Sequence, residues 1–376
     1  MVALNDLSSP EIKSDGVMKK LRAQAAALAR LGWAVSTVVC KDGRVFLQNG
    51  VKAQLLGGYT TSKPYRLKQI LFEYLLKVRF EGGFPSVVYI RGLRITRSYR
   101  RFLKLAKAMH AFVCIELPSV LPLFRKRRRL TTFVGDLMDR LQMMLCRQYI
   151  DCLANFQGYT RLFGKKAVSL ENGLSSEGIR PKAMRQPDGS IRLIAVASME
   201  VHHGYERILQ GLSSYRKQKG SEAVPIQFHL VGEGEQTAYY EDLSRQLGLD
   251  DAVFFHGRKA GRELELLFNA CDLAAGTLGA YKIGLDKISP LKTKEYCLRG
   301  IPFLYACKED ALTSFCRFCK LIPNDASEVS MEEIISFYHE AYKNFPELQN
   351  AMMRHAQKHY SWEAQFLKLF EQPEFQ

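Results

Sequence analysis

The sequence predicts an α/β protein with two tandem domains, each a parallel sheet covered by helices, that face each other across a cleft. The chain has 376 residues, a length more typical of two domains than of one. Segments typical of strands alternate with segments typical of helices in both halves. A polar stretch at 175–190, with two prolines and a Pro-Asp-Gly turn, is interpreted as the linker. We therefore expect domains at 1–180 and 181–360.

Apolar segments alternate with amphipathic segments along the first half. The first expected helix places Val17, Leu21, Ala25 and Leu28 on one face, and Gly32 follows it as a C-terminal cap. The expected strands are 2–6, 33–40, 85–92, 111–117 and 168–173, and the expected helices are 17–31, 67–80, 98–110 and a helical region over 124–180.

The second half repeats the alternation with shorter connections. Ligands of open parallel sheets bind outside the carboxyl ends of the strands, so the loops that follow these strands are the first places to look for a site. The expected strands are 191–198, 226–232, 252–257, 272–278 and 301–306, and the expected helices lie near 204–219, 236–247, 261–270 and 290–299.

The composition is that of an ordinary globular protein with a strong positive charge. Hydrophobic residues make up 47% and charged residues 24%, and the net charge of +16 indicates an anionic partner. No apolar run reaches the roughly 18 residues of a membrane span, and the first residues do not have the pattern of a signal peptide. The nine cysteines are scattered, and Cys316 and Cys319 lack a second pair, so reduced thiols in the cytoplasm are expected.

A helix that begins near Ser289 carries cations where they are locally unfavourable. Ser289 is expected as the N-cap and Pro290 as the first helical residue. Lys287, Lys292 and Lys294 then crowd a helix end that is already partly positive. A bound diphosphate would reverse the sign of that interaction, because lysines and free backbone N–H groups both favour it.

Glu295 lies one turn further into the same helix. A carboxylate accepts two hydrogen bonds at once, which suits the vicinal hydroxyls of a ribose. A solvated helix face is an equally good interpretation of Lys292, Lys294 and Glu295 from these residues alone.

Four other positions stand where strands end. The Gly-x-Gly at 232–234 and the glycine at Gly16 each precede an expected helix and could approach a phosphate, although a plain turn explains either one. His203 follows the strand at 191–198 and is interpreted as a cleft residue or a packed loop residue rather than a metal ligand. Glu116 ends the strand at 111–117 and could contact an acceptor hydroxyl or cap the next turn.

Basic residues gather in the first half. Arg94, Arg97, Arg101 and Lys104 have helical spacing, and residues 125–129 are an unbroken run of five cations. Apolar and aromatic neighbours favour a surface for anionic lipid head groups. A nucleic-acid surface and a solvated basic face are the alternatives.

These pieces together resemble the retaining glycosyltransferases of family four, which have the GT-B fold of two Rossmann-like domains. The resemblance is greatest to bacterial members that build capsular, exopolysaccharide or O-antigen chains. It is most specific in the second half. The segments that carry it are SDGVMKK, SLENGL, VASMEVHHGYERILQGL, HLVGEGE, VFFHGRKAGRELELLFNACDLA, SPLKTKEYCLRGIPFLYA and HYSWEAQF.

The resemblance implies that the second domain binds a nucleotide-sugar. The segment that includes Ser289, Leu291 and Lys292 would face the diphosphate, Glu295 the ribose, and the loop at Arg258 the base. Gly16 would lie near the diphosphate from the first domain, and a last helix at about 361–376 would cross back onto that domain.

Two positions depart from the family pattern. Lys287 stands where the family often has a first glutamate, and His203 precedes the glycine where a lysine is usual. Arg207, Lys282 and Lys292 are the cations that could supply the missing positive charge.

The function expected from the sequence is transfer of a sugar, of the hexosyltransferase type, from a nucleotide donor to a lipid-linked saccharide, with retention of configuration. Glu116 and Lys292 are the expected catalytic residues, and His203 is expected to bind the donor. Neither a cofactor nor a metal ion is expected. The protein would lie at the inner face of the membrane and bind no nucleic acid. The alternatives are an inactive nucleotide-binding or assembly protein of the same fold, and a sugar-nucleotide epimerase.

Overall fold

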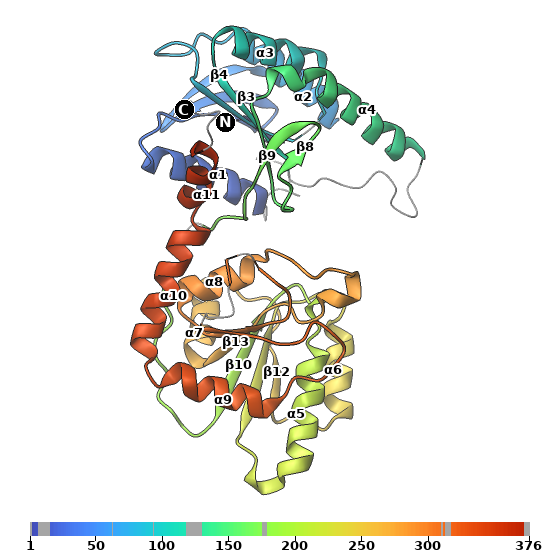
Figure 1. The fold of residues 1–376 in the computed structure, drawn as a ribbon, viewed down its shortest axis with the longest axis vertical. Helices are drawn as coiled ribbons and strands as arrows, with labels where there is room; N and C mark the ends of the chain where they lie inside the picture. The colour runs from blue at the N-terminus through green and yellow to red at the C-terminus, as the bar shows by residue number, and fades with distance from the viewer. Residues whose placement is uncertain are drawn as a thin grey trace. The chain divides into compact units, whose positions relative to one another are not determined.

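The computed structural model describes residues 2–6, 16–61, 63–92, 94–117, 130–174, 179–309, 311–312 and 317–371. The chain forms two compact units, each of which is an α/β body (Figure 1). Unit 1 comprises residues 1–175 and 362–376, and unit 2 comprises residues 176–361. The basic run at 125–129 and Cys316 lie outside the described residues.

Unit 1 is built on a nine-stranded sheet in the order β4-β3-β2-β1-β5-β6-β7-β9-β8. Its central strands from β2 to β9 pair in parallel, whereas β3, β4 and β8 add antiparallel pairs at the two edges. The strands are β1 (Val2–Asp6), β2 (Ser36–Lys41), β3 (Arg44–Asn49), β4 (Lys52–Gly58), β5 (Val87–Arg91), β6 (Phe112–Leu117), β7 (Cys152–Asn155), β8 (Arg161–Leu162) and β9 (Lys165–Ser169).

Helices cover both faces of this sheet (Figure 1). Apolar residues of α1 and α11 pack with Tyr89 and Cys114 on one face, and those of α2 and α3 pack with Ile90 and Val113 on the other. The alternation of neighbouring strand residues between the two cores is what a pleated strand requires. The helices are α1 (Gly16–Arg30), α2 (Pro64–Leu75), α3 (Arg97–Ala108), α4 (Leu130–Cys146) and α11 (Trp362–Phe370).

Unit 2 is built on a six-stranded, fully parallel sheet in the order β12-β11-β10-β13-β14-β15. The strands are β10 (Ile191–Val196), β11 (Ile226–Val231), β12 (Val253–Phe255), β13 (Leu273–Ala275), β14 (Phe303–Tyr305) and β15 (Cys319–Leu321). The helices are α5 (Glu206–Lys219), α6 (Thr237–Gln246), α7 (Gly261–Ala270), α8 (Leu291–Arg299), α9 (Met331–Tyr342) and α10 (Phe345–Tyr360).

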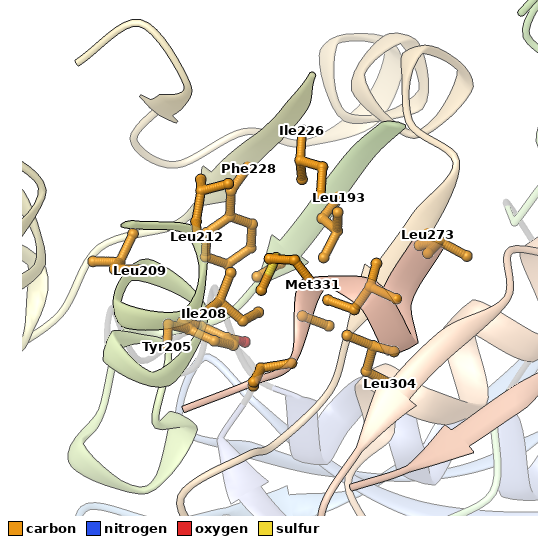
Figure 2. Close-up of a cluster of buried hydrophobic side chains, with 14 of the residues drawn as sticks. Leu193, Tyr205, Ile208, Leu209, Leu212, Ile226, Phe228, Leu273, Leu304 and Met331 are labelled. Carbon is orange, nitrogen blue, oxygen red and sulfur yellow. The ribbon is translucent and has the colours of Figure 1, made fainter. Parts of the chain in front are cut away.

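One face of this sheet carries the main core of unit 2. Leu193, Phe228 and Leu273 project from three strands toward Ile208 of α5 and Met331 of α9 (Figure 2). On the other face, the Tyr296 hydroxyl of α8 donates to the Ala275 carbonyl at 3.1 Å. The Tyr296 hydroxyl also accepts from the Val196 amide at 3.3 Å, so α8 is bonded to the adjacent strands β10 and β13.

The prediction of parallel sheets covered by helices is confirmed, with differences in detail. The helical region expected over 124–180 is wrong beyond Cys146, because β7, β8 and β9 follow α4. The polar residues between 41 and 60 form β3 and β4, which alternate too weakly to be recognised at an exposed edge. The strand expected over 272–278 ends at Ala275, and residues 276–279 form a loop.

Among the described residues, no helix has both the length and the apolar composition needed to cross a bilayer.

We expect that Phe228→Ala lowers the stability of the protein by about 3–5 kcal/mol, because Phe228 is fully buried in the core of unit 2. The measurement is denaturant unfolding followed by circular dichroism. Leu266→Ala is the control, since Leu266 is largely exposed and should cost less than about 0.5 kcal/mol. Equal effects of the two changes would contradict this assignment of the core.

Candidate functional site

The candidate site lies in unit 2, where β10 and β13 end and α8 begins. These strands are neighbours in the sheet, so the loops that follow them emerge side by side. Such a position, at the carboxyl edge of a parallel sheet, is where ligands of this architecture bind.

The two loops contact each other through their backbones. The Leu278 amide donates to the His203 carbonyl at 2.9 Å, and the Gly279 amide donates to the His202 carbonyl at 3.1 Å. Gly204 has φ +65°, and a Cβ at this position would lie 2.6 Å from the Gly279 nitrogen. Glycine is therefore required for both the backbone conformation and the close approach.

The start of α8 differs by one residue from the prediction. Pro290, not Ser289, is the N-cap, with an extended backbone and no side-chain hydrogen bond to the helix. The first turn contains no acidic residue. Its leading N–H groups therefore keep the partial positive charge that is typical of an uncapped helix end.

Lys294 reaches back toward this helix end from the buried side of α8. Its side chain is buried, its Nζ donates to the Ser289 hydroxyl at 2.7 Å, and it lies over the ring of Tyr360. Lys292 and Lys294 point to opposite faces of the helix, because they are two residues apart.

Lys292 is the cation that stays at the site. Its Nζ lies 3.2 Å from the Tyr205 hydroxyl, and it forms no ion pair with a carboxylate of the described residues. Burial lowers the pKa of Lys292 to about 7. A bound anion would therefore find a cation that nothing else in the described structure neutralises.

His203 is a neutral side chain at the same place. Its Nδ1 accepts from the Glu200 amide at 2.9 Å, so the ring proton is on Nε2. Burial, and then Lys292 and His202, lower the pKa of His203 to about 2. His203 can donate one hydrogen bond but cannot replace a lysine as a source of positive charge.

Arg207 and Lys282 have partners within unit 2. The buried Arg207 guanidinium donates to the carbonyl oxygens of Leu278 and Ser327, which holds the loop after β13 in place. Lys282 forms an ion pair with Glu206 at 2.5 Å. Their direct contact with a donor stays a prediction, and Arg207 is positioned to act through the loop that it anchors.

The remaining predicted donor residues of unit 2 are distributed around this edge. Glu295 is partly exposed and accepts from Arg299 at 2.8 Å. Leu291 is half exposed at the first helical position. Arg258 lies beyond β12, largely exposed, with its Nε 3.4 Å from a Glu233 oxygen.

Two predicted residues belong to unit 1. Gly16 is the first residue of α1. Glu116 is the penultimate residue of β6 and is fully buried. It accepts hydrogen bonds from Gln24 at 2.8 Å and Tyr89 at 2.6 Å, and it forms ion pairs with Lys20 and Arg91 at about 3 Å.

These four partners use the hydrogen-bonding capacity of Glu116. Burial alone would raise the pKa of Glu116, but the charges and hydrogen bonds around it hold that pKa below its usual value. The carboxylate therefore ties α1 to β5 and β6 in the described structure. Its contact with an acceptor stays a prediction, and would require an acceptor hydroxyl to replace one of the four partners.

Three site residues were missed from the sequence. Tyr205 contacts Lys292, and Gly279 contacts Gly204. Glu309 follows β14, and its carboxylate accepts a hydrogen bond at 2.9 Å from the hydroxyl of Thr293, a residue of α8. The sequence does contain a signal for Gly279, since a Gly-x-x-Gly at 276–279 follows an apolar strand. The strand expected over 272–278 includes the first three residues of that motif and so hides the loop.

The geometry is that of an anion site. A helix end without an acidic residue in its first turn, a lysine without a carboxylate partner and a loop packed closely enough to require glycine meet at one sheet edge. Helix N-termini and lysines both favour phosphate groups.

Part of unit 2 matches a known family. Residues 179–278 match the model of the glycosyl transferases group 1 family. This stretch contains β10, β11, β12, β13 and the loop with Gly204. No curated protein sequence matches the chain.

The structure of the whole chain is similar to solved glycosyltransferase structures. A glycosyltransferase from Rickettsia africae has a TM-score of 0.60 at 11% identity, covering 98% of this chain and 96% of that one. Sucrose-phosphate synthase from Thermosynechococcus elongatus has a TM-score of 0.57 at 15% identity, covering 93% and 90%. A trehalose-6-phosphate structure from E. coli, bound with UDP-2-fluoro glucose, has a TM-score of 0.57 at 12% identity. The match covers 99% of this chain and 98% of that one.

These likenesses extend over nearly the full length of the chain and establish the GT-B fold, with two Rossmann-like domains. The group 1 match falls on the domain that holds the candidate anion site.

We expect Lys292 to make nucleotide binding depend on pH. Its pKa is about 7 in the unliganded protein, and a bound diphosphate raises it, so binding takes up a proton. The affinity for a nucleoside diphosphate should therefore fall as the pH rises from 7 to 9, by up to about tenfold per pH unit. Isothermal titration in buffers of different ionisation enthalpy measures the proton uptake directly.

Lys292→Met should weaken binding at pH 7 and abolish both the proton uptake and the slope. The control is Lys219→Met, which removes an exposed pair with Glu332 at the far end of α5. A slope that survives Lys292→Met would assign the proton to another group.

Proposed function

We propose that this glycosyltransferase of the GT-B fold transfers a sugar from a nucleotide-sugar to a saccharide acceptor with retention of configuration. We propose further that the acceptor is lipid-linked and that the product is a surface polysaccharide such as a capsule or O-antigen. Nucleotide-sugar transfer is supported by the group 1 match and the fold. Retention, the acceptor and the polysaccharide rest on the resemblance of the sequence segments.

The observation that carries the proposal is the environment of Lys292. A partly buried lysine with a pKa of about 7 and no described carboxylate partner is costly for the folded protein. A diphosphate bound there would offset this free-energy cost, because the Lys292 ammonium then has a negative counter-charge. The uncapped start of α8 adds its N–H groups to the same ligand.

The proposed chemistry depends on the departure of the diphosphate. The bond between the anomeric carbon and the phosphate oxygen breaks, the acceptor oxygen bonds to that carbon, and the acceptor hydroxyl passes its proton to an oxygen of the departing diphosphate. The leaving diphosphate gains negative charge during this step. Lys292 and the N–H groups of α8 stabilise that charge in place of a metal ion, and His203 donates one neutral hydrogen bond.

The other donor residues have proposed roles that follow their positions. Glu295 binds the ribose hydroxyls, and Leu291 and Ser289 border the diphosphate. Arg258 lies next to the base, and Gly16, in unit 1, approaches the diphosphate. Arg207 and Lys282 act by holding the loops near His203, since each is engaged with a partner of its own.

The proposed acceptor accounts for the basic part of unit 1. Arg94, Arg97, Arg101 and Lys104 are all exposed, and α3 carries three of them. Cations at a membrane surface attract anionic head groups. We propose that the protein works as a peripheral protein at the cytoplasmic face of the membrane, where lipid-linked saccharides are available.

The experiment that tests the proposal combines binding and turnover. The full chain is titrated with UDP-, GDP- and ADP-sugars, and the donor that binds is incubated with lipid-linked saccharides in the presence of EDTA. The expected result is a product with retained configuration, formed without an added metal ion. No binding of any donor would refute the proposal.

The same assay separates the alternatives. Nucleotide binding without turnover would indicate an inactive binding or assembly protein. Conversion of the donor with no acceptor present would indicate an epimerase, and the donor-alone reaction is therefore the control for every acceptor.

We expect Glu295→Ala to weaken nucleoside diphosphate binding by about tenfold to a hundredfold, the value of a hydrogen-bonded charged group. The loss should be smaller when the ribose lacks its 2′-hydroxyl, because the wild-type carboxylate then accepts only from the 3′-hydroxyl. The measurement is a titration of both proteins with the preferred nucleotide and its 2′-deoxy form.

Arg299→Met is the matched control for this variant. It breaks the same ion pair but keeps the carboxylate, so it should preserve the preference for ribose. If Arg299→Met reproduces the loss seen in Glu295→Ala, the effect comes from α8 and not from a ribose contact.

A further inference from the structure

Two histidines of unit 2 are bonded to each other between β11 and the end of β12. His229 lies in β11, and His256 is the first residue after β12. The Nδ1 of His229 lies 3.0 Å from the Nε2 of His256, and the planes of the two rings are 19° apart. One of these nitrogens donates its hydrogen to the other. We refer to the two residues as the imidazole pair.

The imidazole pair lies on the face of the sheet that is opposite the main core of unit 2. Phe228 and Leu230, the neighbours of His229 in β11, are buried in that core. Because side chains alternate along a strand, His229 points to the other face. Phe254 pairs with His229 across the two strands, and its ring stacks on the imidazole with the centroids 5.0 Å apart. The geometry of the pair is therefore fixed by the packing around His229.

The pair is an unfavourable choice for stability alone. The Nε2 of His229 is buried and has no hydrogen-bond partner among the described residues, which costs free energy that an apolar side chain would not cost. Burial, and then His256 and Arg192, lower the pKa of His229 to about 4. Burial and Lys259 also lower the pKa of His256. Both rings are therefore neutral near pH 7, and the hydrogen bond between them persists there. Polar groups kept at such a cost indicate a role other than stability.

The imidazole pair holds the loop that follows β12. The His256 amide donates to the Leu230 carbonyl at 2.9 Å. Gly257, the next residue, has φ +62°, and its carbonyl accepts from the Gly232 amide at 2.7 Å. The start of the loop is thus tied to β11 and to the loop after β11 by two backbone hydrogen bonds and by one bond between side chains, which the pair supplies.

The loop after β11 is in turn packed tightly against the loop after β10. A Cβ on Gly232 would lie 1.8 Å from the Ala197 carbonyl oxygen, and a Cβ on Gly234 would lie 1.6 Å from the Ser198 carbonyl oxygen. The same loop after β10 contains His203 of the candidate site. The pair therefore lies at the outer end of a continuous row of loops that reaches the anion site.

We propose that the imidazole pair positions the loop after β12 against the base of the nucleotide and so determines which base the protein prefers. Hydrogen-bonding groups discriminate between ligands only when they are held in place. The two histidines are positioning residues, and they act through the loop. This inference rests on the proposed function, in which Arg258 lies next to the base. It adds the contact that fixes the segment to which Arg258 belongs.

A metal ion is the other use that proteins make of two imidazole nitrogens at this separation. Protein metal sites of this kind have three or more side-chain ligands. Among the described residues, no group of three or more His, Cys, Asp or Glu side chains is placed to hold a metal ion. This favours a hydrogen bond between the two rings.

The test makes use of the different nitrogens that the two rings employ. The amide of an asparagine reaches about as far from the backbone as Nδ1, and the amide of a glutamine reaches about as far as Nε2. His229→Asn and His256→Gln therefore each keep a hydrogen-bonding group at the bonded position, whereas His229→Leu and His256→Leu remove it. The full chain and each variant are titrated with UDP, GDP and ADP, and with inorganic pyrophosphate, which has no base.

Each leucine variant should bind the preferred nucleotide about fivefold to tenfold more weakly, the value of one hydrogen bond, and should discriminate less between the three bases. Its affinity for pyrophosphate should be unchanged, because α8 and Lys292 are intact. His229→Asn and His256→Gln should restore most of the affinity and the preference. A purely structural role would not produce a loss that depends on the base.

His339→Leu is the matched control. It makes the same change at an exposed position of α9, which packs on the opposite face of the sheet, and it should bind every ligand like wild type. Circular dichroism establishes that each variant is folded. If a leucine variant does not fold, His229→Gln replaces it, because the glutamine amide lies one bond too far from the backbone and should show the same loss for nucleotides alone.

Three outcomes would overturn the inference. In the first, the leucine variants keep the affinity and base preference of wild type. In the second, they lose as much affinity for pyrophosphate as for nucleotides, so the pair supports unit 2 as a whole. In the third, EDTA abolishes nucleotide binding and Zn²⁺ restores it only when both histidines are present, which would assign the pair to a metal ion. A wild type that binds no nucleotide would instead refute the proposed function, and this inference with it.

Discussion

The candidate site depends on one close approach, between the loop after β10 and the loop after β13. Gly204 and Gly279 bring the two backbones so near that a side chain on either would collide with the other loop. Two amide-to-carbonyl hydrogen bonds and the Arg207 guanidinium hold the approach. This close approach of the two loops fixes the position of His203. It also fixes the position of Tyr205, which lies next to Lys292.

That approach sets the electrostatics of the edge. With the loops closed, Lys292 loses water, and its pKa falls to about 7. The His203 ring also loses water, and together with the nearby Lys292 and His202 this lowers its pKa so that the ring stays neutral. The folded protein thus carries a cost in free energy that a bound anion would remove. Only a ligand that supplies negative charge where α8 begins gains from this arrangement.

Unit 1 uses charge in the opposite way. The buried Glu116 has four partners and therefore stabilises the junction of α1 with the sheet. Its folded-state pKa is lowered, so this contribution is present above the usual carboxyl pKa and is lost as the pH falls below it. At the surface of the same unit, Arg97, Arg101 and Lys104 of α3 are exposed.

The sequence by itself determined the alternation of strands and helices, because apolar periodicity and glycine positions depend only on local order. It also marked the segment from Ser289 to Glu295, since cations at a helix start break a local rule. It did not show β3, β4 or β7, whose weak patterns acquire meaning only when they add to a sheet. Only the tertiary structure decided that Lys292 lies beside Tyr205 whereas Lys294 is buried between Ser289 and Tyr360. The choice depends on which face of α8 the core covers, and that is decided by residues far away in the chain.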